Sequence, residues 1–258
     1  MDLLAELAER LVCGDGAMGT LLLDRGVPVD HCLEELCLSE PDRILAVHQE
    51  YVAAGARVIE TNTFGANRVR LARFGLEDRT AEINKAAVRL SRKATHGKEI
   101  CPAGSVGPLG ISSHEAEERG IDRNACFREQ VTAPIEAEVD LMFFETFLNF
   151  EEMEIALRAT PKSDCLNGPR AMVQLFEKLP AGDLLAAYPN AGYPRYIEGR
   201  YVYPTAPDYF AKAAREAAAQ GARLIGGCCG TTPAHIAAVS KMLVDRRLGR
   251  SKSSCLVG

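Results

Sequence analysis

The chain has 258 residues, of which 47% are hydrophobic and 25% charged, and its net charge is −5. This composition is typical of a globular protein, and α/β barrels of about 250 residues often form one domain. Lysine and arginine are scattered among acids, and no apolar run approaches the roughly 18 residues of a membrane span. We therefore expect no nucleic-acid or membrane partner.

The chain begins with MDLLAELAERLV, which is acidic and amphipathic and lacks the basic start and apolar centre of a signal peptide. A cytoplasmic location is the resulting expectation. In a reducing compartment the nine cysteines are not expected to form a disulfide framework, so a cysteine cluster favours metal binding or catalysis.

Short apolar runs alternate with longer amphipathic segments along the chain. Asp2 can cap the first helix, Pro41 opens the second and Gly55 ends it. The runs that predict strands are 12–15, 57–62, 99–106, 140–145, 184–189 and 223–228. The segments that predict helices are 2–11, 39–55, 80–95, 123–139, 147–160, 169–179, 207–220 and 233–247.

This alternation predicts an α/β fold with a parallel sheet, either doubly wound or closed as a barrel. Notable polar residues follow the carboxyl ends of many strands: Asp15, Thr61 to Thr63, Ser105, Glu145, Asn190 and the pair Cys228-Cys229. Both architectures place their sites at these ends, and the spread over many strands favours a (β/α)8 TIM-type barrel. We assign residues 1–245 to the barrel and 246–258 to a polar, basic tail or linker.

One interval is too short for this barrel. After Glu145 there is room for one helix to about Thr160, and Asp164-Cys165 follows at once. A complete βαβ unit needs roughly 30 residues. The region around strands five and six is therefore missing or shortened, and we predict a break between Thr160 and Cys165.

The segment GGCCGTTPAHI, residues 226–236, contains two adjacent cysteines. Neighbouring side chains on a strand point to opposite faces, so Cys228 and Cys229 can share one metal only where the backbone turns. The flanking glycines allow such a turn, and Pro233 is typical of the first position of the helix that follows. Packed core cysteines and a strained vicinal disulfide are the alternatives.

Two thiolates do not complete a zinc site, so a third ligand is required. Cys165 is the best-placed candidate for the third zinc ligand. It precedes Asn167-Gly168-Pro169, where a predicted strand ends and a helix begins. Cys13, before the Asp15 loop, is the second choice.

Six motifs together resemble the homocysteine S-methyltransferase family over residues 1–245. They are GDGAMGT (14–20), ETNTFGAN (60–67), AGSVGP (103–108), ETF (145–147), PNAG (189–192) and GGCCGTTPAHI (226–236). The sequence near the N-terminus most resembles the N-terminal half of bacterial bifunctional proteins that join this domain to a methylenetetrahydrofolate reductase.

The resemblance implies that Zn²⁺ is held by Cys165, Cys228 and Cys229. It also implies that Glu145 and Asp15 bind the ammonium group of homocysteine and that Asn190 lies near the metal. Backbone N–H groups of Gly16 and Ala17 can take the substrate carboxylate. Zinc coordination removes the thiol proton, so the bound sulfur can attack a methyl group and yield methionine.

The methyl donor is less clearly indicated. The absence of Trp, and Gly65 where betaine-using relatives have Tyr, weigh against an aromatic cage for betaine. A methylcorrinoid or methyltetrahydrofolate is favoured, with S-methylmethionine as an alternative. A corrinoid protein or a folate-binding or reductase domain is the expected partner.

Two other classes of protein are alternatives. Residues 14–19 fit the dinucleotide pattern GxGxxG, but Asp15 would face the pyrophosphate with the wrong charge, and no clear second strand ends in an acid about 20 residues further on. A degenerate zinc-binding relative without activity is the other reading, and the shortened interval after Glu145 motivates it.

Overall fold

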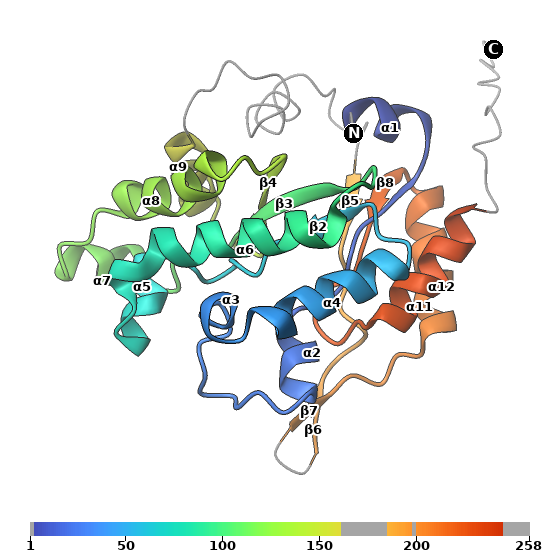
Figure 1. Ribbon diagram of the computed structural model, residues 1–258, viewed down its shortest axis with the longest axis horizontal. Coiled ribbons are helices and arrows are strands. Elements are labelled where there is room, and N and C mark those ends of the chain that lie inside the picture. Colours follow the sequence, from blue (N-terminus) through green and yellow to red (C-terminus); the bar gives the residue numbers. More distant parts are fainter. Residues whose placement is uncertain (1–2, 161–184, 198–199, 245–258) are drawn as a thin grey trace, which may run out of the picture.

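A computed structural model describes residues 3–160, 185–197 and 200–244 (Figure 1). The first half contains α1 (Leu3–Glu9), β1 (Val12–Cys13), α2 (Gly19–Asp24), α3 (Leu36–Ser39), α4 (Pro41–Ala53), β2 (Val58–Glu60), α5 (Arg68–Leu71), η1 (Ala72–Phe74), η2 (Glu77–Arg79), α6 (Thr80–Thr95) and β3 (Cys101–Val106). The second half contains α7 (Ser113–Glu118), α8 (Arg123–Glu136), β4 (Leu141–Phe144), α9 (Phe150–Ala159), β5 (Leu185–Ala187), β6 (Arg195–Ile197), β7 (Arg200–Val202), α11 (Pro207–Ala219), β8 (Ala222–Ile225) and α12 (Pro233–Val244).

Six of the described strands form two parallel sheets, with orders β2-β3-β4 and β1-β8-β5, and β6 and β7 pair as an antiparallel hairpin. A single parallel bridge between Gly14 and Val58 brings the end of β1 beside β2. All six predicted strands are thus present, and their parallel pairing confirms the α/β class. The pairings of the described strands do not close a barrel. The predicted break, the predicted helix 169–179, Cys165 and the tail 246–258 lie outside the described residues.

Helices α4 and α6 cover the strands in Figure 1, and the main apolar core lies between α4, α12, α11 and the strands. The largest fully buried side chains of this core include Tyr51, Leu22, Leu36, Ile44, Ile59, Ile225 and Ile236. Helix α6 buries Ile83, Ala86, Ala87 and Val88, which pack into three apolar clusters where α6 lies against α4, α8 and β3. No helix in the described part of the chain is long and apolar enough to cross a membrane.

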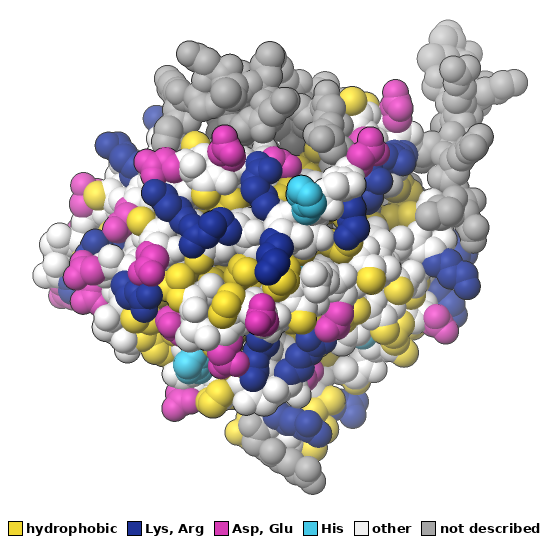
Figure 2. Space-filling model, in the orientation of Figure 1, with side chains coloured by type: hydrophobic (Ala, Val, Ile, Leu, Met, Phe, Trp, Pro, Cys, Tyr) yellow, Lys and Arg dark blue, Asp and Glu magenta, His cyan; other side chains and the backbone are white. Residues whose placement is uncertain are grey.

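Side chains fix the starts of several helices. Asn149 accepts hydrogen bonds from the N–H groups of Glu151 and Glu152 at the start of α9, and Asp122 accepts from Ala125 at the start of α8. Each such cap typically contributes about 1 kcal/mol. On the face drawn in Figure 2, basic and acidic side chains are interspersed.

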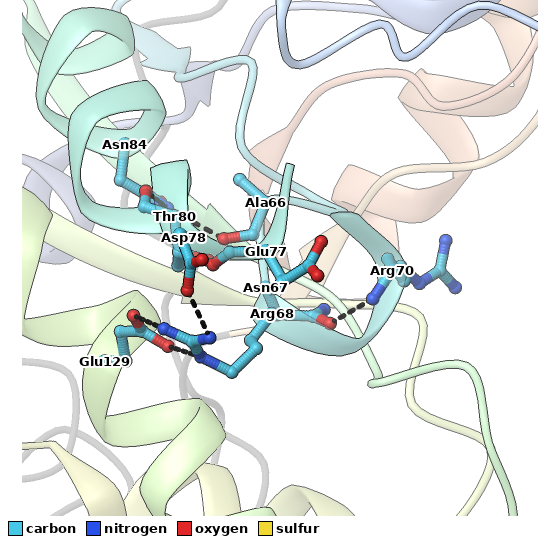
Figure 3. Close-up of polar contacts among 9 residues, drawn as sticks. All are labelled: Ala66, Asn67, Arg68, Arg70, Glu77, Asp78, Thr80, Asn84 and Glu129. Atoms are coloured by element: carbon cyan, nitrogen blue, oxygen red, sulfur yellow. Dashed lines mark hydrogen bonds and ion pairs between the residues drawn. The ribbon is translucent and has the colours of Figure 1, made fainter. Parts of the chain in front are cut away.

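The segment after β2 is anchored to the surrounding helices (Figure 3). Asn67 caps α5 by accepting from the Arg70 N–H at 3.0 Å. Arg68 donates two hydrogen bonds to Glu129 on α8 and one, at 2.9 Å, to Asp78. Asn84 on α6 donates to the carbonyl of Ala66 at 2.8 Å. These contacts hold the carboxyl end of β2 in place.

His48 on α4 is fully buried, and neither ring nitrogen has a hydrogen-bond partner among the described residues. Desolvation lowers the pKa of His48 from 6.5 to about 4. Because the unfolded chain then binds the proton more tightly, stability that is present above pH 6.5 is lost as the pH falls towards 4. The loss should reach about 3 kcal/mol.

This prediction can be checked by urea unfolding at pH 7.5 and pH 4. His48→Leu should remove most of that acid-dependent loss, whereas His96→Gln, at an exposed position, should keep it. Equal pH dependence of the wild type and His48→Leu would show that His48 is not the source.

Candidate active site

Cys228 and Cys229 follow β8, at the point where the strand gives way to the turn before α12. Their sulfur atoms are 3.9 Å apart, far from the 2.05 Å or so of a disulfide, and both are free thiols. Two sulfurs bound to one tetrahedral zinc at 2.3 Å lie about 3.8 Å apart. Both residues are half-buried rather than packed in the core. The vicinal disulfide and the packed-core alternatives therefore do not fit, and the pair fits a metal.

A network of hydrogen bonds holds this cysteine turn. The Thr231 hydroxyl donates to the Cys228 carbonyl at 2.7 Å, and its oxygen accepts from the Ala17 N–H at 3.0 Å. Gly230 has a φ of 78°, and a Cβ there would lie 2.0 Å from the Tyr203 ring. Glycine is therefore required at this position.

The PNAG segment lies directly beside the cysteine turn. The Cys228 N–H donates to the Pro189 carbonyl, and the Ala191 N–H donates to the Cys229 carbonyl, both at 2.9 Å. Asn190 lies between these two contacts, and its side chain is exposed. The structure thus brings Asn190 to the cysteines.

The two thiols influence each other's ionisation. A hydrogen bond from Cys228, with a second from the Tyr203 hydroxyl, lowers the pKa of Cys229 to about 6. Donating that hydrogen bond raises the pKa of Cys228 well above its usual value. The hydrogen bond thus favours the thiolate form of Cys229, and the thiolate is the form that binds metals.

Tyr203 follows β7 of a hairpin, β6–β7, that the sequence analysis did not predict. The hairpin projects from the rest of the fold in Figure 1. The alternating aromatic residues Tyr196, Tyr201 and Tyr203 in RYIEGRYVY were its signal. Tyr203 adds a residue to the site that sequence reasoning missed.

Replacing Tyr203 by Phe should weaken zinc binding about 10-fold, because removal of a hydrogen bond to a metal ligand usually costs 10- to 100-fold in affinity. Zinc affinity can be measured by competition with a chromophoric chelator. Tyr201→Phe is the matched control, since Tyr201 is 62% exposed on the same hairpin. Equal affinities of the two variants would contradict a role for Tyr203.

A group of carboxylates lies close to the cysteine turn. Asp15 is buried and accepts from the Glu60 N–H at 2.8 Å, while its own carbonyl accepts from the Gly227 N–H at 2.9 Å. Glu145 follows β4, accepts a hydrogen bond from the Ser105 hydroxyl and lies near enough to Asp15 to raise its pKa. Burial is the larger cause of the raised pKa of Asp15. This cluster can bind a cation.

The other residues predicted to bind the substrate carboxylate or the metal lie in different surroundings. The Ala17 N–H donates to Thr231, so Gly16 is the better candidate for binding a substrate carboxylate. The Cys13 thiol donates to the carbonyl of Gly14, and burial raises its pKa to about 12. Cys13 therefore belongs to the core, and its choice as second candidate ligand is not supported. The described residues contain no group of three or more possible metal ligands, and Cys165 lies outside them.

Parallel strands, a free thiol pair and a carboxylate cluster at the carboxyl ends of those strands define an α/β protein with a thiol-rich site. The family model described as homocysteine S-methyltransferase matches residues 12–164 and 162–243. The chain therefore belongs to the homocysteine S-methyltransferase family, as the six motifs predicted.

Curated relatives and solved structures agree with this family. Methionine synthase from Mycobacterium tuberculosis is 29% identical over an alignment of 303 positions, which covers 95% of this chain. The corresponding protein of Mycobacterium leprae is 27% identical and covers 93%. The chain spans only about 25% of the length of these relatives.

The structure is similar to crystal structures of the homocysteine methyltransferase MmuM from Escherichia coli. The metallated form is 27% identical, with a TM-score of 0.64, and the match covers 93% of this chain and 98% of that one. The oxidised form is 28% identical, with a TM-score of 0.66 and coverage of 90% and 95%. The two segments matched by the family model meet at residues 162–164, within the interval that the sequence shows to be short.

Proposed function

We propose that this protein transfers a methyl group to the sulfur of homocysteine, giving methionine, at a zinc ion held by Cys165, Cys228 and Cys229. The observation that carries the proposal is the 3.9 Å separation of two free thiols in a turn whose Gly227 N–H donates to the carbonyl of the buried Asp15. The similarity to an Escherichia coli homocysteine methyltransferase described as metallated supports it. We also propose that residues 1–245 form a TIM-type barrel with a shortened region around strands five and six.

Each part of the site has a role in this reaction. Zinc, when bound, keeps the homocysteine sulfur as a nucleophilic thiolate at neutral pH. Asp15 and Glu145 bind the ammonium group, and the Gly16 N–H binds the carboxylate, so the amino acid is held by both ends. Asn190 lies beside the cysteines and orients the sulfur side of the substrate. The half-buried position of both cysteines leaves room for a substrate to approach.

For the methyl donor we propose a methylcorrinoid or methyltetrahydrofolate, delivered by a partner protein or domain. The similarity to one quarter of two methionine synthases supports this choice. S-methylmethionine is the alternative donor. A cytoplasmic location is proposed as well, and it is supported by the free state of the seven cysteines that the structure describes.

Methionine formation tests the proposed function. The zinc-loaded chain is incubated with homocysteine and, separately, with methylcobalamin, methyltetrahydrofolate or S-methylmethionine, and methionine is measured. Methionine from any of them supports the proposal and identifies the donor. Stoichiometric zinc without methionine from all three would instead support a degenerate zinc-binding relative.

A further inference from the structure

The carboxylate cluster contains a third acid that the sequence analysis did not assign. Glu60 ends β2, and its carboxyl group lies within hydrogen-bonding distance of that of Glu145. The charged groups that act on Glu60 are Glu145 and Asp15, both of which are acidic. Two carboxyl groups in such contact keep a proton between them unless a cation separates them.

The hydrogen bonds indicate which group carries this proton. Asp15 accepts from the Glu60 N–H, and Glu145 accepts from the Ser105 hydroxyl, so each of these two carboxyl groups has a hydrogen-bond donor. Among the described residues, no N–H or hydroxyl group donates to the Glu60 carboxyl group. Burial first, and then Glu145 and Asp15, raise the pKa of Glu60 well above its usual value.

Tyr188 is the third titratable group near Glu60, after Glu145 and Asp15. Its hydroxyl is buried and has no hydrogen-bond partner among the described residues. Burial and the nearby acids raise the pKa of Tyr188, so the phenol is neutral and adds no further charge. A buried polar group without a partner carries a free-energy cost, and a ligand or a newly formed carboxylate can remove it.

We propose that Glu60 is a third carboxyl group of the ammonium site and exchanges its proton for the ammonium group of the bound amino acid. This proposal rests on the proposed function. As the ammonium enters, its N–H groups replace the contact between Glu60 and Glu145. The Glu60 O–H bond breaks, the proton leaves to water, and Glu60 becomes an anionic acceptor to which Tyr188 can donate.

Calorimetry with L-methionine measures this exchange, because methionine carries the ammonium group but no thiol proton. Binding to the zinc-loaded chain is measured at pH 7 in two buffers that differ in ionisation enthalpy. Wild type should release about one more proton per bound methionine than Glu60→Gln. Glu117→Gln, on the exposed surface of α7, should behave as the wild type. Equal proton release by wild type and Glu60→Gln would overturn the proposal.

Infrared spectroscopy of the chain alone gives a second readout that does not depend on binding. A band of a protonated carboxyl group should be present in the wild type at pH 7 and absent in Glu60→Gln. Absence of the band from the wild type, or its persistence in Glu60→Gln, would overturn the proposal. Failure of both homocysteine and methionine to bind the wild type would instead contradict the proposed function, while the infrared comparison would still decide the protonation of Glu60.

Discussion

Replacement of Cys228 or Cys229 by alanine is expected to abolish zinc retention and methionine formation together. The two sulfurs are 3.9 Å apart, as two ligands of one tetrahedral zinc are, and neither can be replaced by a neighbour among the described residues. Removing a residue that hydrogen-bonds to a metal ligand usually lowers metal affinity 10- to 100-fold. Removing a ligand itself should therefore lower zinc affinity more than about 100-fold. Zinc content after dialysis and turnover are the two measurements.

Cys126→Ala is the control for this experiment. Cys126 is a buried thiol on α8, in a core cluster separate from the one that contains Ile225 at the end of β8. The variant should keep its zinc, although removal of a buried sulfur will lower its stability. Full zinc occupancy after substitution of Cys228 or Cys229 would refute the assignment of the metal site.

Glu145→Gln should leave zinc bound while weakening homocysteine binding by about 2–5 kcal/mol, the usual cost of truncating one partner of a desolvated charge pair. Asp15 would still bind the ammonium group, so binding is weakened rather than lost. Simple thiols without an amino group should be affected far less, because they make no contact with the carboxylate cluster.

Glu151→Gln provides the matched control, since the Glu151 side chain is 61% exposed on α9 and pairs with Arg123. Homocysteine affinity can be measured by calorimetry on the zinc-loaded proteins. An affinity of Glu145→Gln within twofold of the wild type would show that the ammonium group is held elsewhere.

The strands and the turn that holds Cys228 and Cys229 could be predicted from the sequence because their signals lie in neighbouring residues. Short apolar runs bounded by glycine and helix caps predict strands wherever they occur, and all six predicted strands are present. The glycines around Cys228 and Cys229 predicted a turn, and Gly230 does adopt a positive φ. Glu145 was a candidate because it ends the predicted strand 140–145, and its role in binding the ammonium group stays a prediction.

The residues that the sequence analysis missed depend on contacts between distant segments. Glu60 lies inside a predicted strand run, and its place beside Glu145 arises from the pairing of β2, β3 and β4. Tyr203 reaches Cys229 only because the β6–β7 hairpin lies beside the cysteine turn. Cys13 and Asp15 flank Gly14, yet the Cys13 thiol packs in the apolar core, while the Asp15 carboxylate accepts from the Glu60 N–H.

Zinc X-ray absorption spectroscopy with and without homocysteine tests the central claim most directly. We expect one zinc per chain with three sulfur ligands near 2.3 Å and a lighter fourth ligand, which homocysteine replaces with a fourth sulfur. An unchanged zinc environment at saturating homocysteine, or a zinc with fewer than three sulfur ligands in the protein alone, would contradict the proposed site and its chemistry.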